Sequence, residues 1–489
     1  MRQFVAIFRR LALYLTLAVL GFVLGVTTLY IFWVRSGPSL EPWHTETLGA
    51  EFSLDKADGI QTFDDYRRLE ERLFSQLDER IYARTQTGPE FTLARYSAGS
   101  LSDPRRQNLN WNRSFELPAE SPAGGVLLLH GMSDSPYSLR ALGEHLNRNN
   151  YWVVGLRLPG HGTLPSGLKS VTWQDMAAAV RLGMAHLALK AGKKAIHIVG
   201  YSTGAPLAIE YALGAMEGTR GPTPASLVLI SPAIGISPAA ALARWKGALA
   251  KLPGLEKFAW TSILPEFDPY KYNSFTTNAG DQVHRLTRIV AGRIAAKAAS
   301  GPIKDFPPTL VFLSTVDATV SVDAVIDNLL EHLAPSDRHE LVLFDINRSS
   351  VNRSVLVSNP GPLTARLMDN AGLPFSVTLV ANQTPKSAMV VARRKGSLTK
   401  ETSTEQLNVG WPPGIFSLSH IALPFPPDDP LYGRHPPADS NMIFLGTMAV
   451  QGERGLLRFS SDWLVRLRHN PFYDFLESRT LEWVKGAGG

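Results

Sequence analysis

The segment A-I-H-I-V-G-Y-S-T-G-A, residues 195–205, decides the fold of this 489-residue chain. Its apolar first half predicts a buried strand, and a run with helical spacing follows the turn. A serine in a G-x-S-x-G turn between strand and helix is exposed above the sheet edge, where its hydroxyl can attack a substrate. Gly200 and Gly204 leave room for the turn, because larger side chains would clash across it. Ser202 is therefore the candidate nucleophile.

The same strand, turn and helix pattern repeats outward from this segment. Further strands are predicted at 126–129, 152–158, 227–230, 309–314 and 340–344, and helices at 137–146, 173–191, 205–216 and 322–333. This alternation predicts an α/β fold, with a mostly parallel sheet and helices on both faces. Residues 232–303 interrupt the pattern, and we expect them to form a helical lid with helices at 239–252 and 283–299. Residues 347–406 contain strand-like stretches and predict a small β-rich excursion beside the active site.

A serine hydroxyl needs a base, and the base needs a carboxylate to orient it. In this kind of fold the order along the chain is Ser, then Asp or Glu, then His. Asp317 comes just after the strand predicted at 309–314, so it is the predicted acid. Asp323 lies where a helix begins and is typical of a helix-initiating carboxylate.

The base must follow Asp317 in the chain. The candidates are His332, His339, His420, His435 and His469. His420 is preferred because its segment, S-L-S-H-I-A-L-P, reads as a loop; His435 is the reserve, and His469 is expected to be solvated on a basic helix. Two backbone N–H groups must also hold the developing oxyanion, and Thr203 and Met132 occupy the expected positions.

Residues 11–34 carry no charge and would form a helix roughly 36 Å long, enough to cross a bilayer. Arg2, Arg9 and Arg10 precede this stretch and only Arg35 follows closely, which favours a cytoplasmic N-terminus. A cleaved signal peptide is the alternative, but the apolar stretch is long for one and no small-x-small site follows it. We therefore expect a single-pass protein of the inner (cytoplasmic) membrane, with its catalytic domain periplasmic or otherwise extracytoplasmic.

The sequence divides into three expected parts. Residues 1–35 form the membrane anchor, residues 36–118 a linker and helical extension, and residues 119–489 the catalytic domain. An amphipathic helix is predicted in the extension at 63–77.

Composition excludes several other functions. The net charge is only +6 and there is no dense basic block, so a nucleic-acid partner is not expected. The chain contains no cysteine, which excludes a thiol nucleophile, a disulfide framework and a cysteine-ligated metal. The sequence has no H-E-x-x-H and no phosphate-binding or dinucleotide motif, so it predicts neither a metal nor a cofactor.

Five motifs together resemble bacterial α/β-hydrolases related to monoacylglycerol lipases and carboxylesterases. They are L-L-L-H-G-M-S-D-S-P-Y-S-L (127–139), L-R-L-P-G-H-G-T (156–163), V-G-Y-S-T-G-A (199–205), L-S-T-V-D-A-T-V-S (313–321) and S-H-I-A-L-P-F-P-P-D-D-P-L-Y-G (419–433). The resemblance spans roughly residues 124–484. It implies a Ser-Asp-His triad that cleaves carboxylic esters, often of lipids or lysolipids. Carried over residue by residue, it implies Ser202 as nucleophile, Asp317 as acid, His420 as base, and Met132 and Thr203 as oxyanion donors.

Two alternatives stay open beside a membrane-anchored esterase or lipase. A peptidase or amidase of the same fold would use the same triad, and an acidic pocket containing Glu266 or Asp268 would favour recognition of a free amine. A non-catalytic binding protein of the same fold is the third reading. The separation of 103 positions between Asp317 and His420 departs from the family pattern, in which one helix and one strand suffice.

Overall fold

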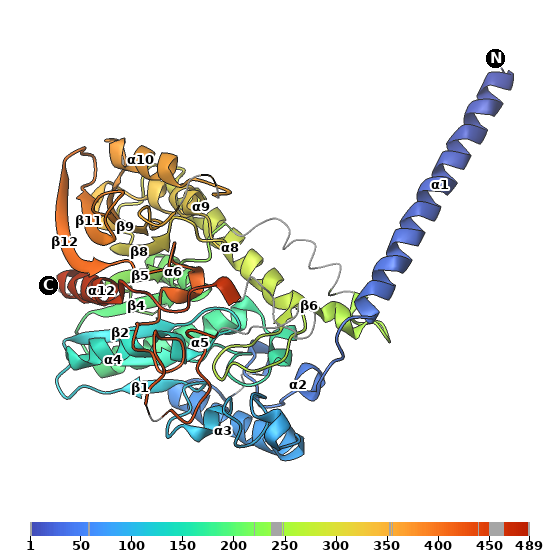
Figure 1. Cartoon of the computed structure of the whole chain (residues 1–489), viewed down its shortest axis with the longest axis horizontal. Helices are drawn as coiled ribbons and strands as arrows, with labels where there is room; N and C mark the ends of the chain where they lie inside the picture. The colour runs from blue at the N-terminus through green and yellow to red at the C-terminus, as the bar shows by residue number, and fades with distance from the viewer. Residues whose placement is uncertain are drawn as a thin grey trace.

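The computed structural model contains one large sheet wrapped by helices, and a long N-terminal helix that projects from it (Figure 1). The structure describes residues 2–56, 59–219, 221–235, 247, 249–351, 354, 356–438, 440–448 and 464–487.

Ten strands form the main sheet within this part of the chain, in the spatial order β1-β3-β2-β4-β5-β8-β9-β10-β11-β12. The strands are β1 (Phe115–Leu117), β2 (Gly124–Leu129), β3 (Tyr151–Leu156), β4 (Ile196–Tyr201), β5 (Ser226–Ile230), β8 (Thr309–Ser314), β9 (Ser336–Phe344), β10 (Phe375–Asn382), β11 (Met389–Lys395) and β12 (Thr402–Gly410). In this spatial order, each strand from β3 across to β10 is parallel to the next. Strands β1, β11 and β12 pair antiparallel with their neighbours. The predicted α/β fold with a mostly parallel sheet is confirmed.

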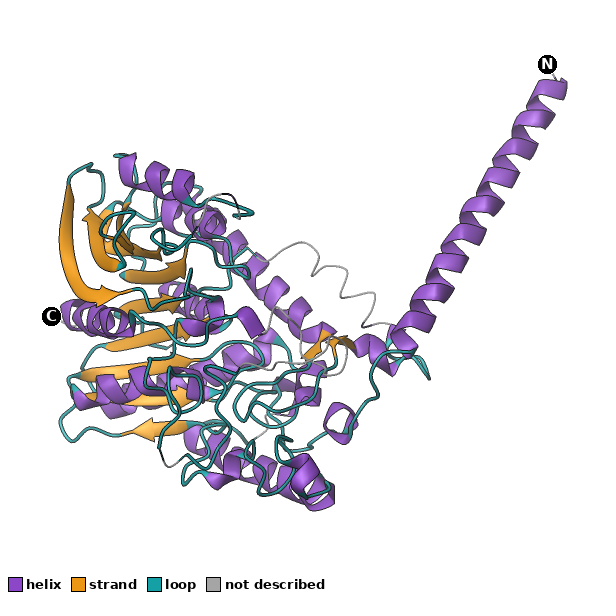
Figure 2. Cartoon of the chain, in the orientation of Figure 1, coloured by secondary structure: helices purple, strands orange, loops and turns teal. Residues whose placement is uncertain are grey.

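Helices cover both faces of the sheet (Figure 2). They are α3 (Phe63–Arg80), α4 (Arg140–Arg148), α5 (Trp173–Ala191), α6 (Gly204–Met216), α8 (Thr277–Ala298), α9 (Val322–Asn328), α10 (Gly361–Asp369) and α12 (Tyr473–Ala487), with α1 (Arg2–Arg35) and α2 (Pro42–Thr45) before them. Successive residues of a strand face opposite sides. In β2, Leu127 and Leu129 therefore join the core under α5, α6 and α8, while Val126 and Leu128 join the core under α4 and α12.

The extension, residues 36–118, packs closely on the core of the sheet. The predicted amphipathic helix is α3, whose Thr62 N-cap accepts a hydrogen bond from the backbone of Asp65. Phe52, Phe63 and Tyr66 belong to the same apolar core as the central strands. The sheet itself begins at β1, ahead of the expected domain start at residue 119.

Residues 347–406 do contain strands, but these strands continue the main sheet. Strand β10 pairs parallel with β9, and β11 and β12 follow it antiparallel, so the sheet is extended beyond β9. Every residue of β10 is buried, because its neighbours and α10 cover it. The expected separate excursion is therefore better described as an extension of the sheet edge, which ends at β12 (Figure 1).

The 232–303 insertion only partly matches the expected helical lid. The first expected helix, at 239–252, lies mostly outside the described residues. The second is α8, whose residues Val283, Leu286 and Val290 pack in the core beside α5 and α6. Between them lie a short 3₁₀ helix, η8 (Glu256–Ala259), and a two-stranded ribbon of β6 (Trp260–Ser262) and β7 (Phe275–Thr276).

Helix α1 is long and apolar enough to cross a membrane from Gln3 to Arg35, with a mean hydropathy of 2.2 and none of that window buried. A signal sequence meets the same criteria of length and composition. Figure 1 shows the helix leaving the domain beside β6, at the end opposite to the C-terminus.

Candidate active site

Ser202 lies in a strained turn at the carboxyl end of β4. Its φ angle is +52°, in the left-handed region that a non-glycine residue rarely adopts. The turn needs both neighbouring glycines, because a Cβ on Gly200 would lie 2.6 Å from the backbone of Gly204. A Cβ on Gly204 would lie 2.1 Å from the carbonyl oxygen of Leu129 in the adjacent strand β2. The backbone of Ser202 is held in turn by its N–H, which donates to Ile230 at 2.9 Å.

The structure brings Asp317 and His420 to this serine from distant parts of the chain. The Nε2 atom of His420 lies 3.1 Å from the hydroxyl of Ser202. On the other side of the ring, Nδ1 lies 2.9 Å from a carboxylate oxygen of Asp317. The His420 side chain is 6% exposed and that of Asp317 is fully buried, so both contacts are shielded from water.

The second carboxylate oxygen of Asp317 accepts the backbone N–H groups of Thr319 at 2.8 Å and Val320 at 3.0 Å. Burial alone would raise the pKa of Asp317, but these bonds and the contact with His420 outweigh it and hold the pKa below its usual value. An ionised Asp317 fixes the proton of His420 on Nδ1, which leaves Nε2 free to accept the serine proton.

The loop that carries His420 is fixed at several points. At the end of β8, Ser314 donates its hydroxyl to the carbonyl of Leu418 at 3.0 Å. Just beyond β9, Asn347 donates its backbone N–H to Phe416 and its side chain to Ile415, each at 2.8 Å. The chain can therefore run through three additional strands after β9 and still return His420 to the position beside Ser202.

The two predicted oxyanion donors lie on either side of Ser202. Thr203 is the N-cap of α6, where unpaired N–H groups and the helix dipole favour negative charge. Met132 belongs to the oxyanion loop, residues 130–135, which follows β2. Strands β2 and β4 are adjacent, and a Cβ on Gly131 would lie 3.0 Å from the Cβ of Ser202. The loop and the serine are therefore in direct contact.

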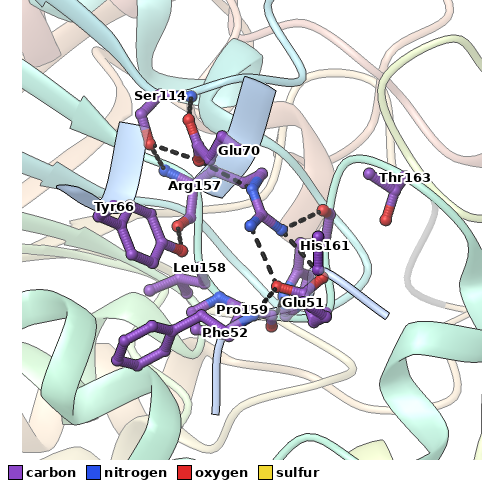
Figure 3. A network of polar contacts seen from close by, with 12 residues as sticks. Glu51, Phe52, Tyr66, Glu70, Ser114, Arg157, Leu158, Pro159, His161 and Thr163 are labelled. Atoms are coloured by element: carbon purple, nitrogen blue, oxygen red, sulfur yellow. Dashed lines mark hydrogen bonds and ion pairs between the residues drawn. The ribbon is translucent and has the colours of Figure 1, made fainter. Parts of the chain in front are cut away.

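A buried ionic network lies beside the oxyanion loop (Figure 3). Arg157, just after β3, is fully buried and contacts Glu51 at 3.0 Å and Glu70 at 2.8 Å, both from the extension. It also donates to the carbonyl of His161 at 3.0 Å. The ring of His161 meets the ring of His130, with centroids 5.0 Å apart, and His130 begins the oxyanion loop.

Among the described residues, no histidine other than His420 forms a hydrogen bond with the side chain of Ser202. The Nε2 of His130 accepts the N–H of Leu158 at 3.0 Å, and its Nδ1 lies 2.8 Å from the Gly131 carbonyl, which matches a turn residue. His339 is buried in β9, His332 lies in a 3₁₀ turn and His435 is exposed.

His469 differs from the sequence prediction. It is 4% exposed and lies outside any helix. The neighbouring Asn470 donates its backbone N–H to Phe425 at 2.8 Å, which holds this segment against the chain that follows His420. Asp323, by contrast, lies in the first turn of α9 with an exposed side chain, as a helix-initiating carboxylate should. No cluster of three or more potential metal ligands occurs among the described residues.

Sequence reasoning missed Asn347 and Arg157 because neither belongs to a catalytic motif. Arg157 lies in the quoted run L-R-L-P-G-H-G-T, immediately after an apolar strand, and a cation there signals a buried partner. Asn347 gives a weaker signal, as a polar residue just beyond a fully apolar strand end.

Comparison with known proteins shows what the chain is similar to. Residues 126–349 match the model of the alpha/beta hydrolase family. A thermostable monoacylglycerol lipase from Bacillus sp. (strain H-257) is 29% identical over 205 residues, which cover 41% of this chain and 74% of that protein.

Solved structures of similar fold include two monoacylglycerol lipases. A soluble variant of the Saccharomyces cerevisiae monoglyceride lipase, in complex with a substrate analogue, is 15% identical and covers 47% of this chain and 82% of its own, with a TM-score of 0.39. The Paleococcus ferrophilus monoacylglycerol lipase is 19% identical and covers 47% of this chain and 88% of its own, with a TM-score of 0.35. The chain has the alpha/beta hydrolase fold, with a mainly parallel sheet, and its residues 126–349 match the model of that family.

Proposed function

We propose that this protein is a membrane-anchored serine hydrolase that cleaves carboxylic esters, with monoacylglycerols or lysolipids as its substrates. The observation that carries the proposal is the hydrogen-bonded series from Asp317 through His420 to Ser202, with distances of 2.9 and 3.1 Å. The relative from Bacillus, a monoacylglycerol lipase, supports the lipid-ester substrate class.

In the proposed reaction, the oxygen of Ser202 attacks the ester carbonyl while His420 Nε2 takes the hydroxyl proton. The carbonyl oxygen becomes an oxyanion, held by the N–H groups of Thr203 and Met132. As this intermediate collapses, the alcohol leaves with the proton from His420 and the acyl group remains on Ser202. Water then attacks the acyl-enzyme, again with His420 as base, and releases the carboxylic acid. Throughout, Asp317 stabilises the charged imidazolium.

Two carboxylates that would suit a peptidase are already engaged. Glu266 accepts the backbone N–H groups of Asn273 at 2.9 Å and Ser274 at 2.8 Å, and it is 3% exposed. Asp268 is 1% exposed and accepts the hydroxyl of Tyr432 at 2.7 Å. Since neither group reaches solvent, neither offers a site for a free substrate amine, and the ester reading is favoured.

We propose that the three parts of the chain, residues 1–35, 36–118 and 119–489, have different roles in the cell. Residues 1–35 anchor the protein in the inner membrane and residues 119–489 form the catalytic domain in the periplasm or elsewhere outside the cytoplasm. The extension, residues 36–118, serves as a fixed part of the folded domain, since its Glu51 and Glu70 pair with buried Arg157.

The test uses the purified chain in detergent, a fluorophosphonate probe and a panel of esters and amides. We expect probe labelling and hydrolysis of monoacylglycerol to disappear in Ser202→Ala and to persist in Ser231→Ala, a matched serine with a similarly positive φ of +43°. Labelling of Ser202→Ala at the wild-type level would refute the nucleophile. Faster cleavage of aminoacyl anilides than of esters would replace the esterase by an amidase.

A further inference from the structure

The C-terminal end of α1 is joined to the 232–303 insertion by two contacts. The ammonium group of Lys257, in η8, donates to the carbonyl oxygens of Arg35 at 2.8 Å and Gly37 at 2.6 Å. The ring of Tyr30 meets the ring of Phe258 edge-on, with centroids 5.6 Å apart and planes at 83°. A polar and an aromatic contact therefore act at the same place.

The contact of Lys257 gives hydrogen-bond partners to carbonyl groups at the C-terminal end of α1. The last four carbonyl groups of a helix have no partner within the helix, and a cation beside them is favoured by the helix dipole. Arg35 is the last residue of α1, and Lys257 caps its carbonyl from 222 residues further along the chain.

The aromatic contact sets the depth of the insertion relative to a bilayer. Tyrosine and tryptophan side chains concentrate at the level of the lipid headgroups. Tyr30 and Trp33 stack at the end of the uncharged stretch, and Trp33 is 69% exposed. Because Phe258 touches Tyr30, η8 must lie at that same level when α1 crosses a membrane. Leu252, six residues before Phe258, is 53% exposed and lies on the segment that leads into η8.

The insertion continues from this point to the catalytic centre. Thr277, the first residue of α8, donates its hydroxyl to the carbonyl of Phe258 at 3.0 Å. Tyr272 donates its backbone N–H to Ser133 of the oxyanion loop at 2.7 Å. One continuous segment thus contacts both the membrane helix and the loop beside Ser202, and α1 leaves the domain beside β6 (Figure 1).

We propose that residues 249–258 and the last turn of α1 form one surface that lies on the phospholipid bilayer, at the level of its headgroups. This surface would hold the insertion against the membrane, so that esters resident in the bilayer reach Ser202 without leaving it. The inference rests on the proposed anchor and on the proposed ester hydrolysis, and its test reads the position of the surface without measuring activity.

Because the sequence contains no cysteine, a single introduced cysteine can be labelled specifically. The full chain carries Leu252→Cys, labelled with a polarity-sensitive fluorophore, in phosphatidylcholine vesicles that contain a lipid with a headgroup-level spin-label quencher. The matched site is Leu189→Cys, 83% exposed at the end of α5. We expect about threefold or stronger quenching at residue 252 than at residue 189. Equal quenching at the two sites would overturn the proposal.

A second comparison tests the contacts themselves. In the Leu252→Cys background, Tyr30→Ala with Lys257→Ala should reduce quenching by about half or more, because the insertion is no longer tied to the helix end. The control pair, Tyr14→Ala with Lys193→Ala, removes the same residue types away from the α1–η8 contacts, with the exposed Lys193 outside residues 249–258, and should leave quenching unchanged. An equal loss in both pairs would show that the α1–η8 contacts do not position the surface.

A third probe separates this inference from the anchor on which it rests. Val19→Cys lies in the middle of α1 and should be quenched by a spin label deep in the acyl chains. Without that quenching the anchor is wrong, and the bilayer surface falls with it. With that quenching but none at Leu252→Cys, the anchor stands and only the surface is refuted. Ester hydrolysis, measured on a soluble substrate, reports on Ser202 independently of both.

Discussion

Asn347 donates its side-chain N–H to the carbonyl oxygen of Ile415 at 2.8 Å, across 68 residues of chain. Its backbone N–H binds the next carbonyl, that of Phe416, at the same distance. Asn347 is 1% exposed, and its side-chain oxygen also accepts from Asn382 at the end of β10. It therefore holds the start of the loop that carries His420 and the end of the additional strand together.

We predict that Asn347→Asp lowers kcat by about tenfold to a hundredfold with little change in KM, because a small shift of His420 disrupts proton transfer more than substrate binding. The carboxylate has the shape of the amide but no N–H to donate, so it repels the Ile415 carbonyl. Steady-state kinetics on a soluble ester measure both constants. The matched variant is Asn408→Asp, on exposed β12. A wild-type kcat in Asn347→Asp would contradict the positioning role.

The turn at Ser202 gives a prediction about steric fit. Gly204→Ala places a Cβ 2.1 Å from the carbonyl oxygen of Leu129, which neither backbone can avoid. We expect a loss of about 3 kcal/mol or more of stability, together with loss of probe labelling at Ser202.

The control for this change is Gly292→Ala on α8, where an added Cβ meets nothing within 4 Å. Alanine is the better helix former, so this variant should be as stable as the wild type or more stable by up to about 1 kcal/mol. Thermal unfolding of the two variants decides the matter, and a folded, fully labelled Gly204→Ala would show that the turn can relax.

The sequence alone predicts the three residues of the candidate triad better than it predicts the distant contacts that hold them in place. Ser202, Asp317 and His420 could be selected because each occupies a local pattern, a turn or a strand end whose geometry is fixed by a few neighbouring residues. The structure places these three side chains within hydrogen-bonding distance of one another.

The pairing of distant segments has no such local pattern. The apolar alternation of 375–382 predicts a strand, but it does not say that this strand joins β9 and lengthens the sheet. The carboxylates of Glu51 and Glu70 look like ordinary surface charges until Arg157 lies between them. His469 looks solvated in a basic run, and only the contact of Asn470 with Phe425 buries it.

Because Asp134 in the oxyanion loop is buried, we expect the stability of the folded protein to depend on pH. Burial raises the pKa of Asp134 from 3.8 to about 6, although Lys271, 3.9 Å away, and the N–H of Ser135 oppose the shift. Because the folded protein favours the protonated form, the stability contributed by Asp134 is complete below about pH 4 and is lost as the pH rises through about 6.

We predict that Asp134→Asn removes this dependence. Among the described residues, Oδ1 of Asp134 accepts the N–H of Ser135 and Oδ2 has no hydrogen-bond partner, and asparagine keeps the Oδ1 acceptor without a charge. The variant should match the wild type near pH 4 and be more stable by about 3 kcal/mol near pH 8. Thermal unfolding in detergent at several pH values measures the difference, with exposed Asp428→Asn as the control. A constant difference across the pH range would exclude Asp134 as the titrating group.

The buried ionic network around Arg157 joins the extension to the core (Figure 3). Arg157→Met keeps the apolar stem but leaves Glu51 and the 4%-exposed carboxylate of Glu70 without their cation. Removing one partner of a buried ion pair costs about 3–5 kcal/mol, because the remaining charge has no compensation. We therefore expect a large fall in the thermal midpoint. Ester hydrolysis should fall too, since the His161 carbonyl loses its donor.

Two comparisons make this prediction sharp. Arg68→Met removes an ion pair with Asp65 at the surface, where Arg68 is 63% exposed, and should cost less than about 1 kcal/mol. Adding Glu70→Gln to Arg157→Met removes the buried charge that was left unpaired, so part of the lost stability should return. If Arg157→Met were no more harmful than Arg68→Met, the extension would be held by its apolar contacts alone, through Phe52, Phe63 and Tyr66. If the second substitution restored stability without restoring kcat, the effect of Arg157 on catalysis would be separate from its effect on stability. Arg157 would then position the oxyanion loop through its bond to the carbonyl of His161.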